Sequence, residues 1–345
     1  MSRIAVMGSG AWGTAIAISL ARRGGHQICL WSFEKDVAEI MRTQRENTTF
    51  LPGFRLDESI AVTADPGEAL RGTEIVVSVT PSEFTRSSFR AFAPHLHAGQ
   101  VLVSATKGIE DVSYLRMTQV IGEVLGERGL QLSCGVMSGP SFAQEVAAGA
   151  PTAITIGSAD QELAARIQRE FSSRTLRLYT NDDVVGVELG GSIKNVIAIA
   201  AGIVAGLGLG FNSNAALITR GIAEMTRLAM ACGGRRETLA GLAGMGDLVL
   251  TCTGSLSRNR TVGMELGRGR SLPEILEGLG GHVAEGVRTT SAALGLARRH
   301  GVEMPIAEQM EAILMHGKAP HQAIEELMMR PGRDEFGLDF RAALG

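Results

Sequence analysis

The chain has few cysteines, few aromatic residues and no excess of basic charge. Its cysteines lie far apart and form no Cys-x-x-Cys pair, which argues against a zinc site or a disulfide framework; they are Cys29, Cys134, Cys232 and Cys252. We therefore expect no bound metal and a reducing, cytoplasmic location. The formal net charge is −3, so no nucleic-acid partner is expected.

Long hydrophobic segments are scarce as well. The N-terminus reaches Gly8 after four apolar residues, too few for the core of a signal peptide. Residues 196–219 carry no charge, but glycines and the polar run Asn212-Ser213-Asn214 interrupt them. The apolar part before that run is shorter than the roughly 20 residues of a membrane-spanning helix. We expect a buried helix and no membrane span.

Two halves of the chain follow different patterns. The first half alternates short β-branched runs with amphipathic segments, which predicts βαβ units and a parallel, doubly wound sheet of the Rossmann type. The expected strands are 3–7, 27–31, 60–63, 74–80, 100–105, 132–137, 152–156 and 176–179. From residue 182 only helical spacing remains, which predicts an all-helical C-terminal domain.

The predicted domain boundary lies between residues 181 and 182. Residues 1–181 are expected to bind a dinucleotide, and residues 182–345 are expected to bind substrate and carry the catalytic groups. Asn181 is expected to cap the long helix that opens the second domain, with Asp182 and Asp183 in its first turn. A ligand site at the domain junction is expected, because clefts favour such junctions.

A glycine-rich loop follows the first expected strand. Gly8, Gly10 and Gly13 have the G-x-G-x-x-G spacing, with Ser9 and Trp12 between them, and a helix follows directly. In this context the pattern predicts that the helix N-terminus binds the pyrophosphate of a dinucleotide. A purely structural strand-to-helix turn is the alternative interpretation.

Glu34 stands 21 residues after Gly13, near the end of the second expected strand. A carboxylate there favours NAD, because it binds the ribose 2′-hydroxyl, whereas basic residues favour the 2′-phosphate of NADP. The neighbouring Lys35 leaves NADP open. A solvated Glu34–Lys35 surface pair is the alternative interpretation.

Two lysines are candidates for chemistry. Lys107 stands at the carboxyl end of a strand, where open parallel sheets bind their ligands, and Gly139 and Ser141 follow another strand in the same way. Lys194 is the only charged residue between Glu188 and Arg220. Burial and a nearby Lys107 would each lower its pKa, making it a proton donor to a developing alkoxide. The alternative is a lysine whose amine reaches water.

An arginine and an asparagine open a later helix. Ser257, Arg258 and Asn259 offer a fork of donors, an amide and free N–H groups, which suits a phosphate dianion. Asp247 and Thr251 precede them. A capped, arginine-rich surface helix is the alternative interpretation.

These residues resemble, over nearly the whole chain, the bacterial NAD(P)-dependent sn-glycerol-3-phosphate dehydrogenase family. The matching blocks span both expected domains: GSGAWGTA at 8–15, TKGIE at 106–110, SGPSFAQEV at 138–146, 178–210, ALITRG at 216–221, GLAGMGDLVLTCT at 241–253, SRNR at 257–260 and VAEGVRTT at 283–290.

The resemblance implies reversible hydride transfer between a nicotinamide and the C2 carbonyl of dihydroxyacetone phosphate, which gives sn-glycerol 3-phosphate for phospholipid synthesis. It implies that Lys194 protonates the carbonyl oxygen, that Lys107 touches substrate and cofactor, and that Asp247 and Thr251 support them. It further implies substrate contacts at Gly139, Ser141, Asn195, Ser257, Arg258 and Asn259. Cofactor contacts are implied at Ser9, Trp12, Lys107, Ala143, Arg258, Val283 and Glu285.

One departure concerns the nucleotide. Relatives often carry His or Arg where this chain has Phe33-Glu34, which weakens the case for NADP and agrees with the argument for NADH. Relatives are commonly homodimers, so a homodimer is expected. The alternatives are a β-hydroxyacid or 6-phosphogluconate-type dehydrogenase, which also has an active lysine, and a nicotinamide-sensing protein without catalysis.

Overall fold

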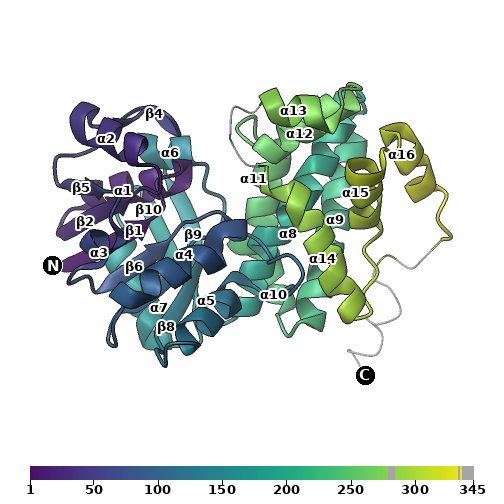
Figure 1. Ribbon diagram of the computed structural model, residues 1–345. Helices are drawn as coiled ribbons and strands as arrows, with labels where there is room; N and C mark the ends of the chain where they lie inside the picture. Colours follow the sequence, from purple (N-terminus) through teal and green to yellow (C-terminus); the bar gives the residue numbers. More distant parts are fainter. Residues whose placement is uncertain (279–283, 333–334, 336–345) are drawn as a thin grey trace.

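Two lobes lie side by side in the computed structural model of the chain, which describes residues 1–278, 284–332 and 335 (Figure 1). The sheet lobe holds an 8-stranded sheet in the order β10-β9-β8-β7-β6-β1-β2-β5. Its strands are β1 Ser2–Met7, β2 His26–Trp31, β5 Ile60–Thr63, β6 Ile75–Ser78, β7 Val101–Ser104, β8 Ser133–Ser138, β9 Thr152–Gly157 and β10 Leu176–Asn181.

The strand order indicates where a ligand binds to the sheet. Taken in chain order, the six strands β5-β2-β1-β6-β7-β8 have the Rossmann order 3-2-1-4-5-6, which reverses between β1 and β6. Ligands of such sheets bind at this reversal, outside the carboxyl ends of the strands. The predicted fold class, a Rossmann-type doubly wound sheet followed by an all-helical part, is confirmed.

The sheet is mixed rather than wholly parallel. Strand β9 runs antiparallel to β8, while β10 runs parallel to β9. The connection between β8 and β9 runs through the short helix α6 (Ala143–Ala148). The chain enters β9 from the carboxyl edge of the sheet, which is why β9 runs opposite to β8.

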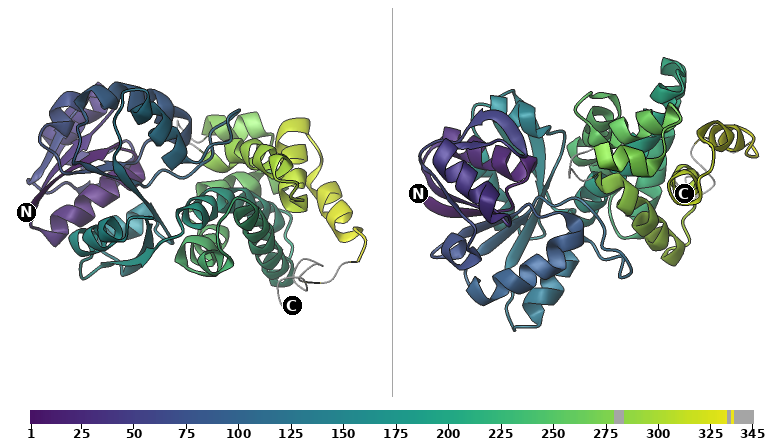
Figure 2. Two further views of the ribbon diagram at one scale, coloured as in Figure 1. Left: turned by 90° about the horizontal axis from the view of Figure 1, so that it is seen from below. Right: turned by 45° about the horizontal axis from the view of Figure 1, so that its top comes forward.

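Helices cover both faces of the sheet (Figure 2). One face packs against α1 (Ala11–Arg23), α2 (Lys35–Gln44), α6 and α7 (Gln161–Phe171). The other packs against α3 (Pro66–Leu70), α4 (Thr85–Phe92) and α5 (Met117–Gly126). Short helices η1 (Ser82–Phe84) and η2 (Ala93–His95) flank α4, and the hairpin β3–β4 (Glu46–Asn47 and Leu51–Arg55), which the sequence did not predict, follows α2.

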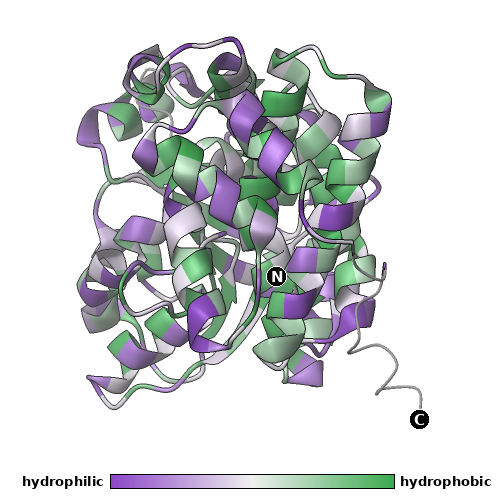
Figure 3. Cartoon of the chain, turned by 90° about the vertical axis from the view of Figure 1, so that its right-hand side faces the viewer, coloured by the Kyte–Doolittle hydropathy of each residue, from purple (hydrophilic) through white to green (hydrophobic). Residues whose placement is uncertain are grey.

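The helical lobe is built around α8 (Val184–Gly206), and the other helices pack on it directly or through a neighbouring helix. These are α9 Phe211–Ala231, α10 Arg236–Ala240, the π-helical turn η3 Leu242–Gly246, α11 Asp247–Thr253, α12 Arg258–Gly267, α13 Leu272–Gly278, α14 Glu285–Arg299, α15 Pro305–His316 and α16 Pro320–Met328. Figure 3 faces this lobe and shows hydrophilic and hydrophobic residues alternating along the outer helices, as amphipathic packing requires.

Helix α8 begins two residues later than predicted. Asp183 is its N-cap, accepting a hydrogen bond from the Gly186 amide, while the Asn181 side chain accepts one from the Asp183 amide. The predicted cap at Asn181 is therefore wrong, because β10 extends through that residue. The proposed division at 181/182 falls between this strand and this helix.

The membrane expectation concerns α8 as well. In the described part of the chain, α8 is the one helix long and apolar enough to cross a membrane, and 89% of its most apolar window is buried inside the protein. It is a core helix, as predicted. No membrane span is found among the described residues.

Glycines allow α8 and α12 to pack closely. A Cβ on Gly202 would lie 2.8 Å from the Cα of Gly263, and a Cβ on Gly206 would overlap the carbonyl oxygen of Met264. Both approaches are closer than real side chains allow. Gly202, Gly206, Gly263 and Gly267 therefore serve backbone contact between α8 and α12.

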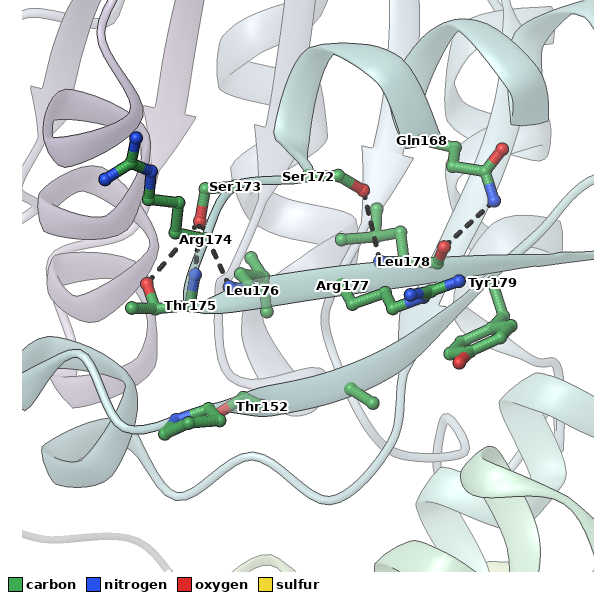
Figure 4. A pocket seen from close by; sticks show the side chains of 12 residues that line it. Thr152, Gln168, Ser172, Ser173, Arg174, Thr175, Leu176, Arg177, Leu178 and Tyr179 are labelled. Carbon is green, nitrogen blue, oxygen red and sulfur yellow. Dashed lines mark hydrogen bonds between the residues drawn. The ribbon is translucent and has the colours of Figure 1, made fainter.

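The outer strand β10 has its free edge covered by side chains (Figure 4). Ser173 Oγ accepts from the Leu176 amide at 3.0 Å, and Ser172 Oγ accepts from the Leu178 amide at 3.2 Å. Gln168 Nε2 donates to the Leu178 carbonyl at 2.9 Å. An open hollow of about 740 Å³ lies beside this strand, and none of the predicted site residues lines it.

Candidate active site

The glycine loop joins β1 to α1 at the reversal of strand order. Gly8 has a φ of +132°, and a Cβ there would lie 2.6 Å from the carbonyl oxygen of Val79. A Cβ on Gly13 would overlap the carbonyl oxygen of Gly8, whereas Gly10 has open space where its Cβ would be. The first and third glycines are therefore required by packing, and the second leaves the backbone free to approach a ligand.

Asn47 holds this loop in place and was missed by the sequence analysis. Its side chain is fully buried, and its Nδ2 donates to the Ser9 carbonyl at 2.7 Å and to Thr14 Oγ1 at 2.8 Å. The residue comes from β3, far along the chain from the loop. A single polar residue in a polar stretch gives no local signal for such a contact.

The end of β2 lies beside the loop. Ser9 Oγ donates to Ser32 Oγ at 2.7 Å, and Ser32 Oγ lies 3.5 Å from Glu34 Oε2. Glu34 and Lys35 are both exposed. Glu34 therefore stands at the carboxyl edge of the sheet next to the glycine loop, and its exposure fits both the ribose contact and the solvated surface pair that the sequence left open.

Four predicted residues meet where the two lobes face each other. Lys194 Nζ contacts Asp247 Oδ1 and donates to Thr251 Oγ1 at 2.8 Å. Lys107 Nζ donates to the other carboxylate oxygen, Asp247 Oδ2, at 2.7 Å. Lys194 is only 6% exposed, so the alternative of an amine reaching water is wrong. The carboxylate bridges one lysine from each lobe.

Burial changes the protonation of this cluster. It lowers the pKa of Lys194 to about 8, with the negative charge of Asp247 opposing the shift and the positive charge of Lys107 adding to it. Burial alone would raise the pKa of Asp247, but the two lysine charges outweigh it and hold that pKa below its ordinary value. Lys194 is thus poised to exchange a proton near neutral pH while Asp247 stays ionised.

The backbone around the cluster sets these distances. Turn η3 packs so closely on α8 that a Cβ on Gly190 would lie 2.6 Å from the Ala243 carbonyl oxygen, and π-helical turns are frequent at functional sites. Ser192, two residues before Lys194, accepts from the Gly108 amide at 2.9 Å and lies 3.1 Å from the Gly108 carbonyl oxygen. Ser192 was also missed by the sequence analysis.

The turn after β8 reaches the same region. Gly139 and Ser141 lie there, with Ser141 Oγ donating to the Gly139 carbonyl at 3.0 Å. The ring of Pro140 lies beside Gly246, immediately before Asp247, because a Cβ on Gly246 would lie 3.5 Å from it. Ala143 is the first residue of α6. The structure thus brings this turn toward the lysine cluster.

Helices α12 and α14 complete the helical side. Asn195 Nδ2 donates to Glu285 Oε2 at 3.4 Å, and Asn259 Oδ1 accepts from the Gly286 amide at 2.9 Å. Burial raises the pKa of Glu285, opposed mainly by the charge of Arg258. Val283 lies outside the described residues.

The predicted phosphate clamp is at the start of α12. Ser257 is the N-cap, with its Oγ accepting from the Arg260 amide at 3.2 Å. Arg258 is exposed, whereas Asn259 is buried. One of the three side chains is therefore open to a ligand, while Ser257 and Asn259 also have structural partners.

The glycine loop fits a phosphate-bearing ligand. No side chain in the described part of the chain caps α1, and the buried indole N–H of Trp12 has no acceptor there. Donors at a helix N-terminus, with open space at Gly10, suit a pyrophosphate. Within residues 1–278, 284–332 and 335, no cluster of three or more His, Cys, Asp or Glu could hold a metal ion.

Comparisons with known proteins match both lobes to one family. Residues 3–164 match the family model described as NAD-dependent glycerol-3-phosphate dehydrogenase N-terminus, and residues 183–325 match that of its C-terminus. The chain belongs to the NAD-dependent glycerol-3-phosphate dehydrogenase family. The resemblance inferred from the sequence is confirmed.

Individual members of this family are close along their full length. The glycerol-3-phosphate dehydrogenase [NAD(P)+] of Acidobacterium capsulatum is 64% identical over 97% of this chain and 100% of its own. That of Koribacter versatilis is 60% identical over 98% and 100%. The crystal structure of the Coxiella burnetii glycerol-3-phosphate dehydrogenase has a TM-score of 0.91 at 40% identity, covering 95% of this chain and 99% of that one.

Proposed function

We propose that the chain catalyses the reversible, NAD(P)-dependent reduction of dihydroxyacetone phosphate to sn-glycerol 3-phosphate, supplying glycerophospholipid synthesis. The observation that carries this proposal is the buried amine of Lys194, held by Asp247 and Thr251 at the carboxyl edge of a dinucleotide-binding sheet. Family membership supports the substrate over that of the β-hydroxyacid dehydrogenases and supports an enzyme over a sensor.

Lys194 is the acid in this proposal. A bound reduced nicotinamide supplies the hydride to C2 of the ketone. Lys194 donates the proton to the carbonyl oxygen and takes it back in the oxidation direction, and its pKa of about 8 suits both tasks near neutral pH. Asp247 and Thr251 orient the amine. Lys107, on the opposite oxygen of Asp247, faces substrate and cofactor from the sheet lobe.

The substrate phosphate is assigned to the start of α12. Arg258 supplies the charge and is exposed, while the first N–H groups of the helix, Ser257 and Asn259 complete the site. Gly139, Ser141 and Asn195 border the ketone. Ser9, Trp12, Ala143, Val283 and Glu285, with the glycine loop, are assigned to the cofactor.

NADH is the favoured nucleotide. Glu34 at the end of β2 offers a carboxylate to the ribose hydroxyls and repels a 2′-phosphate. Replacing it, Glu34→Arg, is expected to raise the kcat/KM ratio of NADPH to NADH. An unchanged ratio would mean that residues other than Glu34 determine the choice between NADH and NADPH.

The deciding experiment follows reduced nicotinamide at about 340 nm with dihydroxyacetone phosphate and each nucleotide. Oxidation of the reduced nucleotide that requires dihydroxyacetone phosphate supports the proposal. If neither NADH nor NADPH is oxidised, the proposal is refuted. In Arg258→Ala the KM for dihydroxyacetone phosphate is expected to rise about tenfold to a hundredfold, the worth of a charged hydrogen bond, with little change for dihydroxyacetone. Arg268→Ala is the matched control, because Arg268 is at the far end of α12 and pairs with Glu265.

A homodimer and a cytoplasmic location complete the proposal. Phe211 at the start of α9 is 93% exposed and Leu209 is 40% exposed, which gives a second copy an apolar surface to cover. All four cysteines are free, as a reducing compartment favours. Light scattering after size exclusion tests the dimer, and cell fractionation tests the location.

A further inference from the structure

A loop of the sheet lobe reaches onto the helical lobe directly after Lys107. Residues 108–116 leave the sheet beyond β7, contact the helical lobe and return to α5; the right-hand view of Figure 2 shows this part of the chain in blue. Ile109 and Arg116 pair as an isolated β-bridge that closes the base of the loop. Ile109 is 4% exposed and belongs to the core of the helical lobe, although it comes from the sheet lobe.

The tip of the loop is fastened to α14. Arg299 Nη1 donates to the Ser113 carbonyl at 2.7 Å and Nη2 to the Val112 carbonyl at 3.3 Å. The Arg299 guanidinium also lies 4.4 Å from the centre of the Tyr114 ring, close enough for a cation–π interaction. The ring fills the space above Gly295, where any Cβ would overlap it. One arginine therefore holds two carbonyls and an aromatic ring of the other lobe.

Both ends of the loop are fastened to α8. At the start, Ser192 bonds Gly108, next to Lys107. At the end, the buried carboxylate of Glu188 pairs with Arg116 and accepts from the Thr118 amide at 2.8 Å. The loop is therefore fastened to the helical lobe at three places, and to the sheet lobe at Glu110, which accepts from Arg86 on α4 at 2.8 and 2.7 Å.

The backbone of the loop is in an unusual conformation. Val112 has a φ of 70° and Tyr114 a φ of 57°, and neither is a residue that favours the left-handed region. Such conformations persist only where surrounding contacts over-determine them, and they cluster at functional sites. The Arg299 contacts fall on the two strained residues and on Ser113 between them.

We propose that residues 108–116 form an inter-lobe strap that holds Lys107 on Asp247, and that Tyr114 and Arg299 are positioning residues for the reduction. This inference rests on the proposed function. The strap acts through Lys107, because Gly108, which Ser192 holds, is the residue next to that lysine. Loosening the tip lets the Lys107 amine withdraw from Asp247, so the reacting groups lose alignment while the glycine loop is untouched.

The test compares two adjacent arginines. Arg299→Ala removes the tip contacts, and Arg298→Ala is the matched control, since Arg298 points to Glu311 on α15 instead. For Arg299→Ala we expect kcat to fall by about tenfold, because a distant substitution that slightly misplaces a reacting group can slow a reaction by this much or more. The dissociation constant for NADH should stay within twofold. Arg299→Lys, which keeps the charge, and Tyr114→Phe, which keeps the ring, are expected to retain most of the wild-type kcat. Equal kcat in Arg299→Ala and Arg298→Ala would overturn the strap.

A second measurement does not depend on catalysis. Hydrogen exchange of peptides covering 108–116 is expected to speed up in Arg299→Ala but not in Arg298→Ala, with exchange in α8 unchanged. Unchanged exchange in the loop would refute the anchoring. Wild-type protein that fails to reduce dihydroxyacetone phosphate refutes the proposed function and with it the role of the strap in reduction. The exchange experiment still decides separately whether Arg299 fastens the loop.

Discussion

The two lobes hold their ligand-facing groups by different physical means. In the sheet lobe the nucleotide loop consists of backbone and neutral side chains, fixed by Gly8, Gly13 and Asn47. In the helical lobe a buried charged cluster, Lys194 with Asp247, carries the proposed chemistry. The first is a steric site, which a single methyl group spoils, and the second is an electrostatic site, which depends on charge more than on volume. Substitutions that remove charge from the second site or add volume to the first test the distinction.

The largest effect is expected from removing the charge of Lys194. In Lys194→Met a side chain of similar length replaces the amine, so the fold is retained and Asp247 keeps Lys107 as its partner. We expect kcat to fall by about a thousandfold, within the range for loss of a general acid. NADH binding, followed by its fluorescence, should stay within threefold. A kcat within threefold of wild type would remove Lys194 from the mechanism.

Adding a methyl group to the glycine loop should have the next largest effect. Gly13→Ala drives a Cβ into the Gly8 carbonyl, so we expect about tenfold weaker NADH binding and about 1–3 kcal/mol less stability, as for an overpacked core. Gly10→Ala, with open space at its Cβ, should leave the melting temperature unchanged. Titration calorimetry and thermal unfolding check both variants. Equal melting temperatures would contradict the steric account.

The electrostatic site should respond to pH. Reduction needs protonated Lys194, so its rate is expected to fall about tenfold per pH unit above the pKa of about 8, whereas oxidation should rise through the same pH and then level. Because the Lys107 charge helps to lower the pKa of Lys194, Lys107→Met should move both limbs to higher pH. Rate profiles between pH 6 and 10 test this. A shift of the profiles to lower pH would contradict the view that the Lys107 charge lowers the pKa of Lys194.

The smallest effect on activity is expected from a buried carboxyl group outside the site. Glu224 on α9 accepts from the Ile306 amide at 2.8 Å, and burial raises its pKa to about 7. The folded chain keeps this proton between about pH 4.5 and 7 where the unfolded chain has lost it, so the group makes stability fall as pH rises. Glu224→Gln should therefore be more stable than wild type at pH 8 by about 1–3 kcal/mol and little different at pH 4.5. Urea unfolding at the two pH values gives the comparison. A Gln variant that is less stable at both would identify the carboxylate as stabilising.

The sheet could be predicted from the sequence better than its connections. Each of the eight expected runs lies on a strand, because β-branched runs between turn residues are a local signal. The reversal at β9 depends on how that strand pairs with β8, and the cap at Asp183 rather than Asn181 depends on where β10 ends. These are tertiary consequences that no local pattern contains.

The site was predicted unevenly for a similar reason. A lone charge in an apolar run marks Lys194, and strand position marks Lys107. The family resemblance named Asp247 only as a polar support. That both lysines bind its carboxylate is seen in the structure, since 140 residues separate Lys107 from Asp247. Asn47 and Ser192 act through single hydrogen bonds to distant backbone, and neither gives a pattern in its own segment.

The outer edge of the sheet bears on whether two copies of the protein can join through their strands. Gln168, Ser172 and Ser173 already occupy the outward backbone groups of Leu176 and Leu178. A foreign strand approaching there finds no template for ladder growth. The edge of β10 is therefore protected from edge-to-edge pairing at Leu176 and Leu178, even though the sheet ends there on a strand.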